Sequence, residues 1–182
     1  MTKKSRGTNL RRLTVCALFA ALISALSPVA LPIGAVPLSL GLCGVLLTSL
    51  ALTPAMSATA VAVYLALGAC GLPIFAAGGA GTAALVSPTG GFLWSYLLAA
   101  PLVSALAVKA RRLVGLFASA LAALPICYLI GTLWYAFITQ THPLAALTVT
   151  VLPFLPFDLC KALAAAWVGG RLRALLRSRL DN

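Results

Sequence analysis

Two charged side chains stand three positions apart in the otherwise apolar stretch PFLPFDLCKALAAAW, residues 153–167. They are Asp158 and Lys161, and Asp158 is one of only two acidic residues in the chain. Side chains at positions i and i+3 of a helix share a face, so this acid and this base would stand together. The carboxylate can accept hydrogen bonds and the ammonium group can donate them. The pair could therefore bind a small solute that carries both donors and acceptors.

The prolines around the pair leave its place in the helix open. A helix that starts near Pro143 would hold the pair in its middle. Alternatively, Pro153 and Pro156 break the segment and a second half-helix starts at Asp158, close to a positive helix end. A structural ion pair would be the simplest role, but burying two ions often costs as much as their attraction returns. We therefore predict that the pair forms a ligand or ion site.

The second candidate is the glycine-rich stretch GLPIFAAGGAGTAALVSPTGGF, residues 71–92. Glycines let the backbone come close to a ligand, and free backbone N–H groups become donors. The alternative is a flexible connection, although apolar residues such as Phe75 and Leu85 indicate that the stretch packs back onto the protein. The aromatic residues that follow could wall a pocket. The predicted binding residues of this region are Gly79, Gly81, Ser87, Thr89, Phe92, Trp94 and Tyr96.

The composition indicates whether the chain that carries these candidate sites is surrounded by water or by lipid. Hydrophobic residues make up 62% of the chain and charged residues 8%, whereas soluble domains carry about 25% charged residues. A chain of 182 residues cannot hide so much apolar surface from water, so we predict one membrane domain, residues 1–182. A charge facing lipid costs about 3 kcal/mol or more, so Asp158 and Lys161 must face the interior of the bundle.

Hydrophobic runs predict an all-α protein with six transmembrane helices. Each run approaches the roughly 20 apolar residues that a helical span needs, and the second is the shortest. Glycine and proline make residues 73–90 unsuitable for a regular helix. The predicted spans are 13–31, 38–53, 55–72, 91–108, 113–138 and 145–169.

The net charge of +11 comes from basic residues at the edges of the apolar runs. They gather in residues 3–12, 109–112 and 171–179, a pattern typical of cytoplasmic loops and ends rather than of a nucleic-acid-binding face. Four predicted spans separate the first two clusters and two separate the last two. Both termini are therefore predicted to be cytoplasmic, with residues 32–38, 73–90 and 139–144 outside.

Alanines recur every fourth residue at positions 17, 21 and 25. Such a stripe of small residues lets another helix approach closely, although alanine is common enough here for the repeat to arise by chance. The sequence has no GxxxxGK[ST] loop for ATP, and no metal site or catalytic residue is predicted. The alternative functions left open are a transporter, channel or membrane enzyme for another small polar solute.

Two stretches together resemble a known family. The segment YLALGACGLPIFAAGGAGTAALVSPTGGFLWSY, residues 64–96, and the later FDLCK, residues 157–161, resemble the BioY family. That family comprises the biotin-binding S components of energy-coupling-factor (ECF) transporters. The resemblance implies an S-component fold in the cell membrane and capture of biotin from outside. It leaves open whether Lys161 meets the ureido carbonyl or the carboxylate of biotin.

The same resemblance implies partners and no cofactor for this chain. The implied partners are a transmembrane coupling protein and two cytoplasmic ATPases, which would consume ATP in place of this chain. The stripe of Ala17, Ala21 and Ala25 resembles the alanine motif by which S components dock on the coupling protein.

Overall fold

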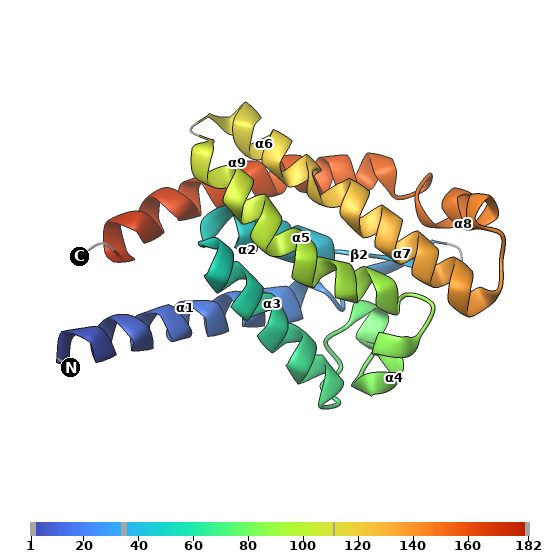
Figure 1. Cartoon of the computed structure of the whole chain (residues 1–182), viewed down its shortest axis with the longest axis horizontal. Helices are drawn as coiled ribbons and strands as arrows, with labels where there is room; N and C mark the ends of the chain where they lie inside the picture. Colours follow the sequence, from blue (N-terminus) through green and yellow to red (C-terminus); the bar gives the residue numbers. More distant parts are fainter. Residues whose placement is uncertain (1–2, 34–35, 111, 181–182) are drawn as a thin grey trace.

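A computed structural model describes residues 3–33, 36–110 and 112–180 of the chain. These residues are mostly helical, and Figure 1 shows the helices packed side by side. The described elements are α1 (Lys3–Leu26), β1 (Ala30–Ile33), β2 (Val36–Ser39), α2 (Gly41–Ala51), α3 (Pro54–Ala69), the 3-10 turn η1 (Ala76–Gly78), α4 (Gly81–Val86), α5 (Gly90–Lys109), α6 (Leu113–Leu121), α7 (Ala123–Thr139), α8 (Pro143–Thr150) and α9 (Leu155–Leu180).

One segment corrects the all-α prediction. The first predicted span reached residue 31, but α1 ends at Leu26, and the chain then forms the antiparallel hairpin β1–β2. Pro32 and Pro37 stand opposite each other in its register. Their fixed φ ends a helix but suits extended backbone, and a two-stranded ladder consists only of edge strands, where proline is tolerated. The prolines therefore mark a hairpin as well as a helix end.

Two predicted spans are interrupted in the structure. The segment predicted as 113–138 consists of α6 and α7, which join at Ala122. The segment predicted as 145–169 consists of α8 and α9, which meet at a bend of 53°. The glycine-rich stretch is also less irregular than expected, because it contains η1 and the short helix α4.

Length and apolar composition identify membrane-crossing helices within the described residues. Helix α5 and the α6–α7 segment satisfy both criteria, and α8–α9 adds a third if the bent pair is one span. Helices α2 and α3 are apolar but shorter. The count of six spans therefore stays a prediction.

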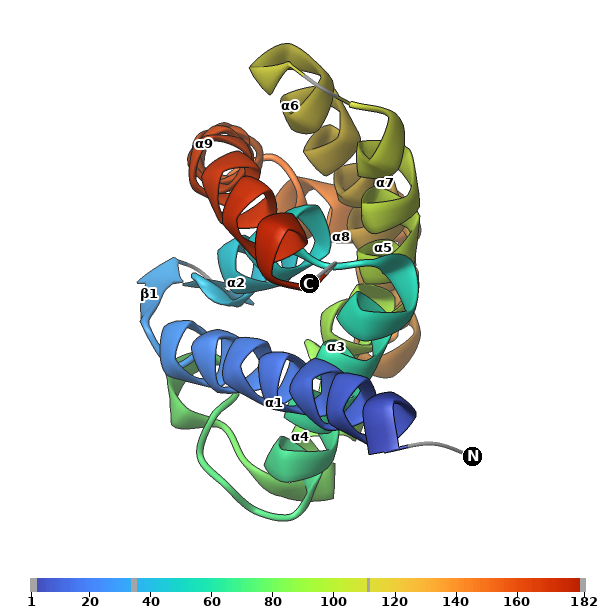
Figure 2. The same cartoon turned by 90° about the vertical axis from the view of Figure 1, so that its left-hand side faces the viewer.

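The chain is arranged so that its basic segments share one end of the bundle. The start of α1, the end of α9, the end of α5 and the start of α6 lie toward the left of Figure 1. The hairpin, α4 and α8 lie toward the other end. Figure 2 views the bundle from the end that holds the basic segments. There α1 runs beside α3, and α9 lies against α2.

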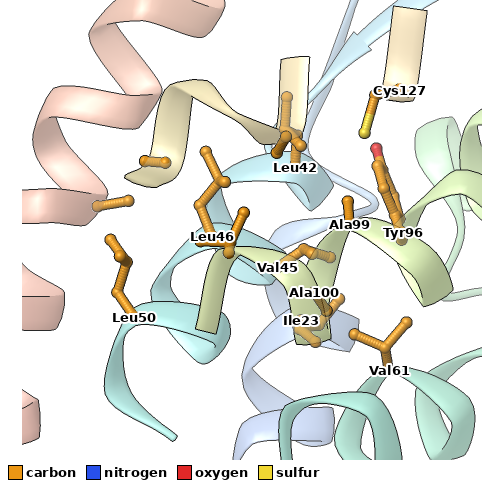
Figure 3. Packing of buried hydrophobic residues seen from close by; sticks show 14 of the residues in the cluster. Ile23, Leu42, Val45, Leu46, Leu50, Val61, Tyr96, Ala99, Ala100 and Cys127 are labelled. Carbon is orange, nitrogen blue, oxygen red and sulfur yellow. The ribbon is translucent and has the colours of Figure 1, made fainter. Parts of the chain in front are cut away.

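Helix α2 lies at the centre of the hydrophobic core. Figure 3 shows its residues Leu42, Val45 and Leu46 meeting side chains from α1, α3 and α5. Toward α7, the hydroxyl end of Tyr96 points to Cys127. Helix α9 packs closely on α2, since a Cβ at Gly169 would stand within 3.0 Å of Leu50. Three alanines of α9 are fully buried in the same core, Ala162, Ala165 and Ala166. This close packing fixes the start of α9, whose first two turns hold the charged pair.

Candidate functional site

The bend between α8 and α9 presents the charged pair to the interior. Helix α9 begins at Leu155, and the backbone N–H of Asp158 donates to the Phe154 carbonyl at 2.8 Å. The second of the two open alternatives therefore holds, with the half-helix starting three residues before Asp158. Asp158 is 4% exposed and Lys161 is 8% exposed. The buried pair thus stands in the first two turns of a helix, against the core.

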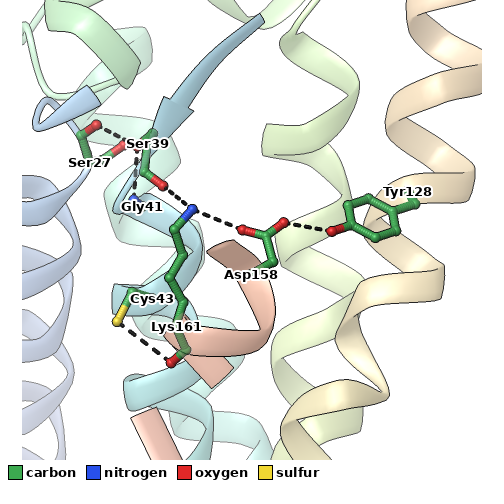
Figure 4. Close-up of polar contacts among 7 residues, drawn as sticks. All are labelled: Ser27, Ser39, Gly41, Cys43, Tyr128, Asp158 and Lys161. Atoms are coloured by element: carbon green, nitrogen blue, oxygen red, sulfur yellow. Dashed lines mark hydrogen bonds and ion pairs between the residues drawn. The ribbon is translucent and has the colours of Figure 1, made fainter. Parts of the chain in front are cut away.

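Both charges are held by further partners, as Figure 4 shows. Lys161 Nζ donates to Asp158 Oδ1 at 2.9 Å and to the backbone carbonyl of Ser39 at 2.8 Å. The Tyr128 hydroxyl of α7 donates to the other carboxylate oxygen, Oδ2, at 2.8 Å. Every buried side-chain nitrogen or oxygen among the described residues has such a partner. Because the ions are paired and hydrogen-bonded, this polar cluster can persist in an apolar interior.

The hairpin side of the cluster is tied to α1 and α3. The Ser39 hydroxyl donates to the Ser27 carbonyl at 2.6 Å, and it accepts from the N–H of Gly41 at 2.8 Å. The hydroxyls of Ser27 and Tyr64 share a hydrogen bond of 2.7 Å. A chain of polar contacts therefore runs from α3 through the hairpin to Lys161, Asp158 and α7.

The pair lines a cavity of about 350 Å³. Small-molecule sites typically enclose about 300–1,000 Å³ and combine apolar walls with a few convergent polar groups. Here the polar groups of Asp158, Lys161 and Tyr128 meet a wall rich in aromatic rings. The lining also includes Ser27, Val36, Pro37, Ser39, Leu42, Phe75, Ala76, Gly79, Ala80, Ala84, Ser87, Thr89, Phe92, Leu93, Tyr96, Cys127, Thr150 and Phe154.

Most residues predicted from the sequence as ligand contacts meet at this cavity, but two do not. Gly81 and Trp94 are not among its lining residues. Gly81 starts α4 with a φ of +76°, and Trp94 is 43% exposed while its indole N–H donates to the Leu85 carbonyl at 3.2 Å. Phe92 and Tyr96 are one turn apart on α5 and face inward together, whereas Trp94 lies between them on another face. We therefore do not include Gly81 and Trp94 among the proposed ligand contacts.

Sequence reasoning missed the partners of the charged pair. Tyr128 carries a phenol in an otherwise apolar run, and that was a usable signal for a polar site. Ser39 contributes its backbone carbonyl, which any residue would supply, so its type carried no signal. The hairpin residues Val36 and Pro37 line the cavity because the segment after α1 folds back over it.

The polar cluster retains free hydrogen-bonding capacity. Each carboxylate oxygen of Asp158 accepts one bond and has a further lone pair. The ammonium group of Lys161 has three donors and uses two of them. The Tyr128 oxygen can still accept after donating to Asp158. The cavity therefore offers a ligand several acceptors and one charged donor.

The alanine stripe faces away from this site. Ala17, Ala21 and Ala25 are exposed along α1, while Cys16, Ala20 and Ile23 of the same helix are buried. The stripe is therefore free to meet lipid or another helix.

The chain is similar to known proteins over nearly its whole length. A family model described as the BioY family matches residues 1–178. The chain belongs to the BioY family. The biotin transporter BioY of Thermotoga maritima is 36% identical over 167 residues, which cover 91% of this chain and 98% of that protein. The biotin transporter BioY2 of Lactococcus lactis is 37% identical over 172 residues, covering 93% and 94%.

A solved structure gives the same result for the fold. It is the crystal structure of the S-component for biotin from an ECF-type ABC transporter, and it matches with a TM-score of 0.85 and 27% identity. The match covers 96% of this chain and 95% of that one. The family resemblance seen in the glycine-rich stretch and FDLCK is confirmed. The overall fold is thus that of an S-component for biotin.

Proposed function

We propose that this chain is the substrate-capture (S) component of a biotin uptake transporter. The observation that carries the proposal is the buried Asp158–Lys161 pair at one wall of an apolar cavity in a BioY-family chain. Biotin offers two ureido N–H donors, a ureido carbonyl, a sulfur-containing ring and a carboxylate tail. The donors suit the acceptors of Asp158, and Lys161 serves the carbonyl or the carboxylate. Phe75, Phe92 and Tyr96 supply apolar contact for the ring and the tail.

The remaining ligand contacts follow from the cavity wall. We assign supporting contacts to Gly79, Ser87 and Thr89, which line the cavity. The hydroxyl groups of Ser87 and Thr89 lie 3.1 Å apart and can reorient toward a ligand.

Delivery of biotin to the cytoplasm requires partners in this proposal. A transmembrane coupling protein and two cytoplasmic ATPases supply the energy, and this chain itself uses no cofactor. The exposed alanine stripe of α1 is the surface on which the coupling protein docks. The chain lies in the cell membrane, with its binding cavity filled from outside.

The orientation in the membrane follows from charge. Six spans with both termini inside place residues 1–12, 109–112 and 171–182 in the cytoplasm. The start of α1, the end of α5, the start of α6 and the end of α9 lie toward one end of the bundle, which supports this arrangement (Figure 1).

External cysteine labelling tests this orientation. In a background without the native cysteines, an impermeant maleimide should label a cysteine that replaces Thr141 but not one that replaces Arg112. Both positions are exposed in the protein, so accessibility differs only by the side of the membrane. After permeabilisation both should react, which controls for local reactivity. Efficient labelling at position 112 in intact cells would overturn the proposed orientation.

Binding of biotin by the purified chain tests the function itself. We expect saturable binding of radiolabelled biotin in detergent without ATP or partner subunits, since the cavity is formed within this chain. Riboflavin and thiamine should not compete at equal concentration. A well-folded chain that does not bind biotin would refute the proposal.

A further inference from the structure

Two of the aromatic rings in the cavity wall rest on glycines of neighbouring helices. The ring of Phe92, from α5, lies against Gly131 of α7, and the ring of Phe75 lies against Gly68 of α3. A Cβ atom at either glycine would stand within 3.0 Å of three ring atoms, closer than real Cβ atoms come. The rings can therefore occupy these positions only because the helix behind each of them has no side chain there.

The neighbours of Phe92 determine in which direction its ring would move if a side chain were added at Gly131. Its ring packs beside the buried cluster of Val36, Leu38 and Phe154, together with Tyr128. Packed interiors resist compression, so these neighbours leave little room. The unfilled space next to the ring is the cavity, which Phe92 lines. A side chain on Gly131 would therefore drive the ring into the ligand space.

The surroundings of Phe75 give it less freedom. Its ring stands edge-on to Tyr64, with centroids 5.4 Å apart, and is only 2% exposed. A change at Gly68 would therefore disturb the packing of the loop and the cavity together. Gly131 is the position where the width of the cavity can be changed with least effect elsewhere.

We propose that Gly131 is a specificity-determining residue, which sets the width of the cavity by seating the Phe92 ring. This inference rests on the proposed binding of biotin. Phe92 packs in the same cluster as Tyr128, which holds the carboxylate of Asp158. If Asp158 accepts the ureido N–H groups, the fused rings of biotin lie beside Phe92. The residue at 131 then selects for the size of the ring system, not for the tail.

The test compares biotin with desthiobiotin, which keeps the ureido ring and tail but lacks the sulfur ring. In the native chain biotin should bind more tightly. Gly131→Ala should reduce this preference by about 10-fold, in the range that overpacking of a filled site produces. Equilibrium titration is used because a Kd does not depend on the fraction of folded protein. Adding Phe92→Leu to Gly131→Ala should restore most of the preference, because the shorter side chain avoids the new methyl group.

Gly170→Ala is the matched control. A Cβ at Gly170 of α9 would stand within 3.0 Å of one atom, Cδ1 of Leu116 from α6, and neither residue lines the cavity. It should leave the ratio of the two affinities within about 2-fold of native. An unchanged ratio in Gly131→Ala, or an equal change in Gly170→Ala, would overturn the inference.

A second measurement covers the case in which Gly131→Ala does not fold. Phe92→Leu in the native background widens the same region, and it should improve binding of biotin sulfone relative to biotin by about 5-fold. No gain for the bulkier sulfone would also contradict the inference. Failure of the native chain to bind biotin at all is a separate result, which would refute the proposed function instead.

Discussion

The double variant Asp158→Asn with Lys161→Met should fold and yet bind biotin about 10- to 150-fold more weakly than the native chain. The estimate follows from the loss of one charge-assisted hydrogen bond, which is worth about 1.5–3 kcal/mol. Removing both charges leaves no unpaired ion in the interior. The Tyr128 hydroxyl can still donate to the side-chain oxygen of an asparagine at 158, so the fold keeps that contact.

The single variants separate stability from binding. Lys161→Met leaves the Asp158 carboxylate buried with Tyr128 as its remaining side-chain partner, and Asp158→Asn leaves Lys161 on the Ser39 carbonyl. Breaking a buried pair in this way costs about 3–5 kcal/mol. We therefore expect each single variant to lose thermal stability in detergent, and the double variant to regain most of it while its biotin affinity stays low.

The opposite result would make the pair structural. In that case the double variant would recover both folding and near-native biotin affinity, and the ligand-site proposal would fail. Cys160→Ala is a suitable control, because this thiol lies between the two charges in sequence but is exposed on the other side of the helix. It should change neither the melting temperature nor the affinity appreciably.

The helices and the charged pair could be predicted from the sequence because each has a local cause. Apolar runs bounded by proline and glycine predicted most helix ends to within a few residues, as at Pro54 and Pro143. The spacing of Asp158 and Lys161 placed both on one helix face, and their salt bridge is found there. The family resemblance came from the same short segments, and the match over residues 1–178 confirms it.

What the sequence did not predict depends on contacts between distant segments. Trp94 could not be separated from Phe92 and Tyr96 without knowing which face of α5 turns inward. The Tyr128–Asp158 bond joins residues 30 positions apart, and the Lys161–Ser39 bond joins residues 122 positions apart. The hairpin was missed because prolines after an apolar run predict the end of a helix. They indicate an edge strand only when the partner strand is known.

Ala21→Leu should lower biotin uptake by at least about 10-fold in cells that hold the complete transporter, while the isolated chain still binds biotin with native affinity. Ala21 is exposed in the middle of the alanine stripe, and the larger side chain would hold a docking helix away. The site is unaffected because the stripe faces away from the cavity, and none of its three alanines is a lining residue. Overpacking a close helix contact costs about 1–3 kcal/mol, which sets the size of the effect.

Ala105→Leu provides the matched control for this docking surface. Ala105 is an exposed alanine on α5, so it adds the same side chain to a face that we assign to lipid. It should leave uptake and binding unchanged, whereas Ala21→Leu should also reduce the amount of coupling protein that copurifies with this chain. If Ala21→Leu lowered uptake and the affinity of the isolated chain together, α1 would belong to the binding site or to the core of the fold. If Ala105→Leu blocked uptake equally, the docking surface would extend to α5, and the alanine stripe would not define it.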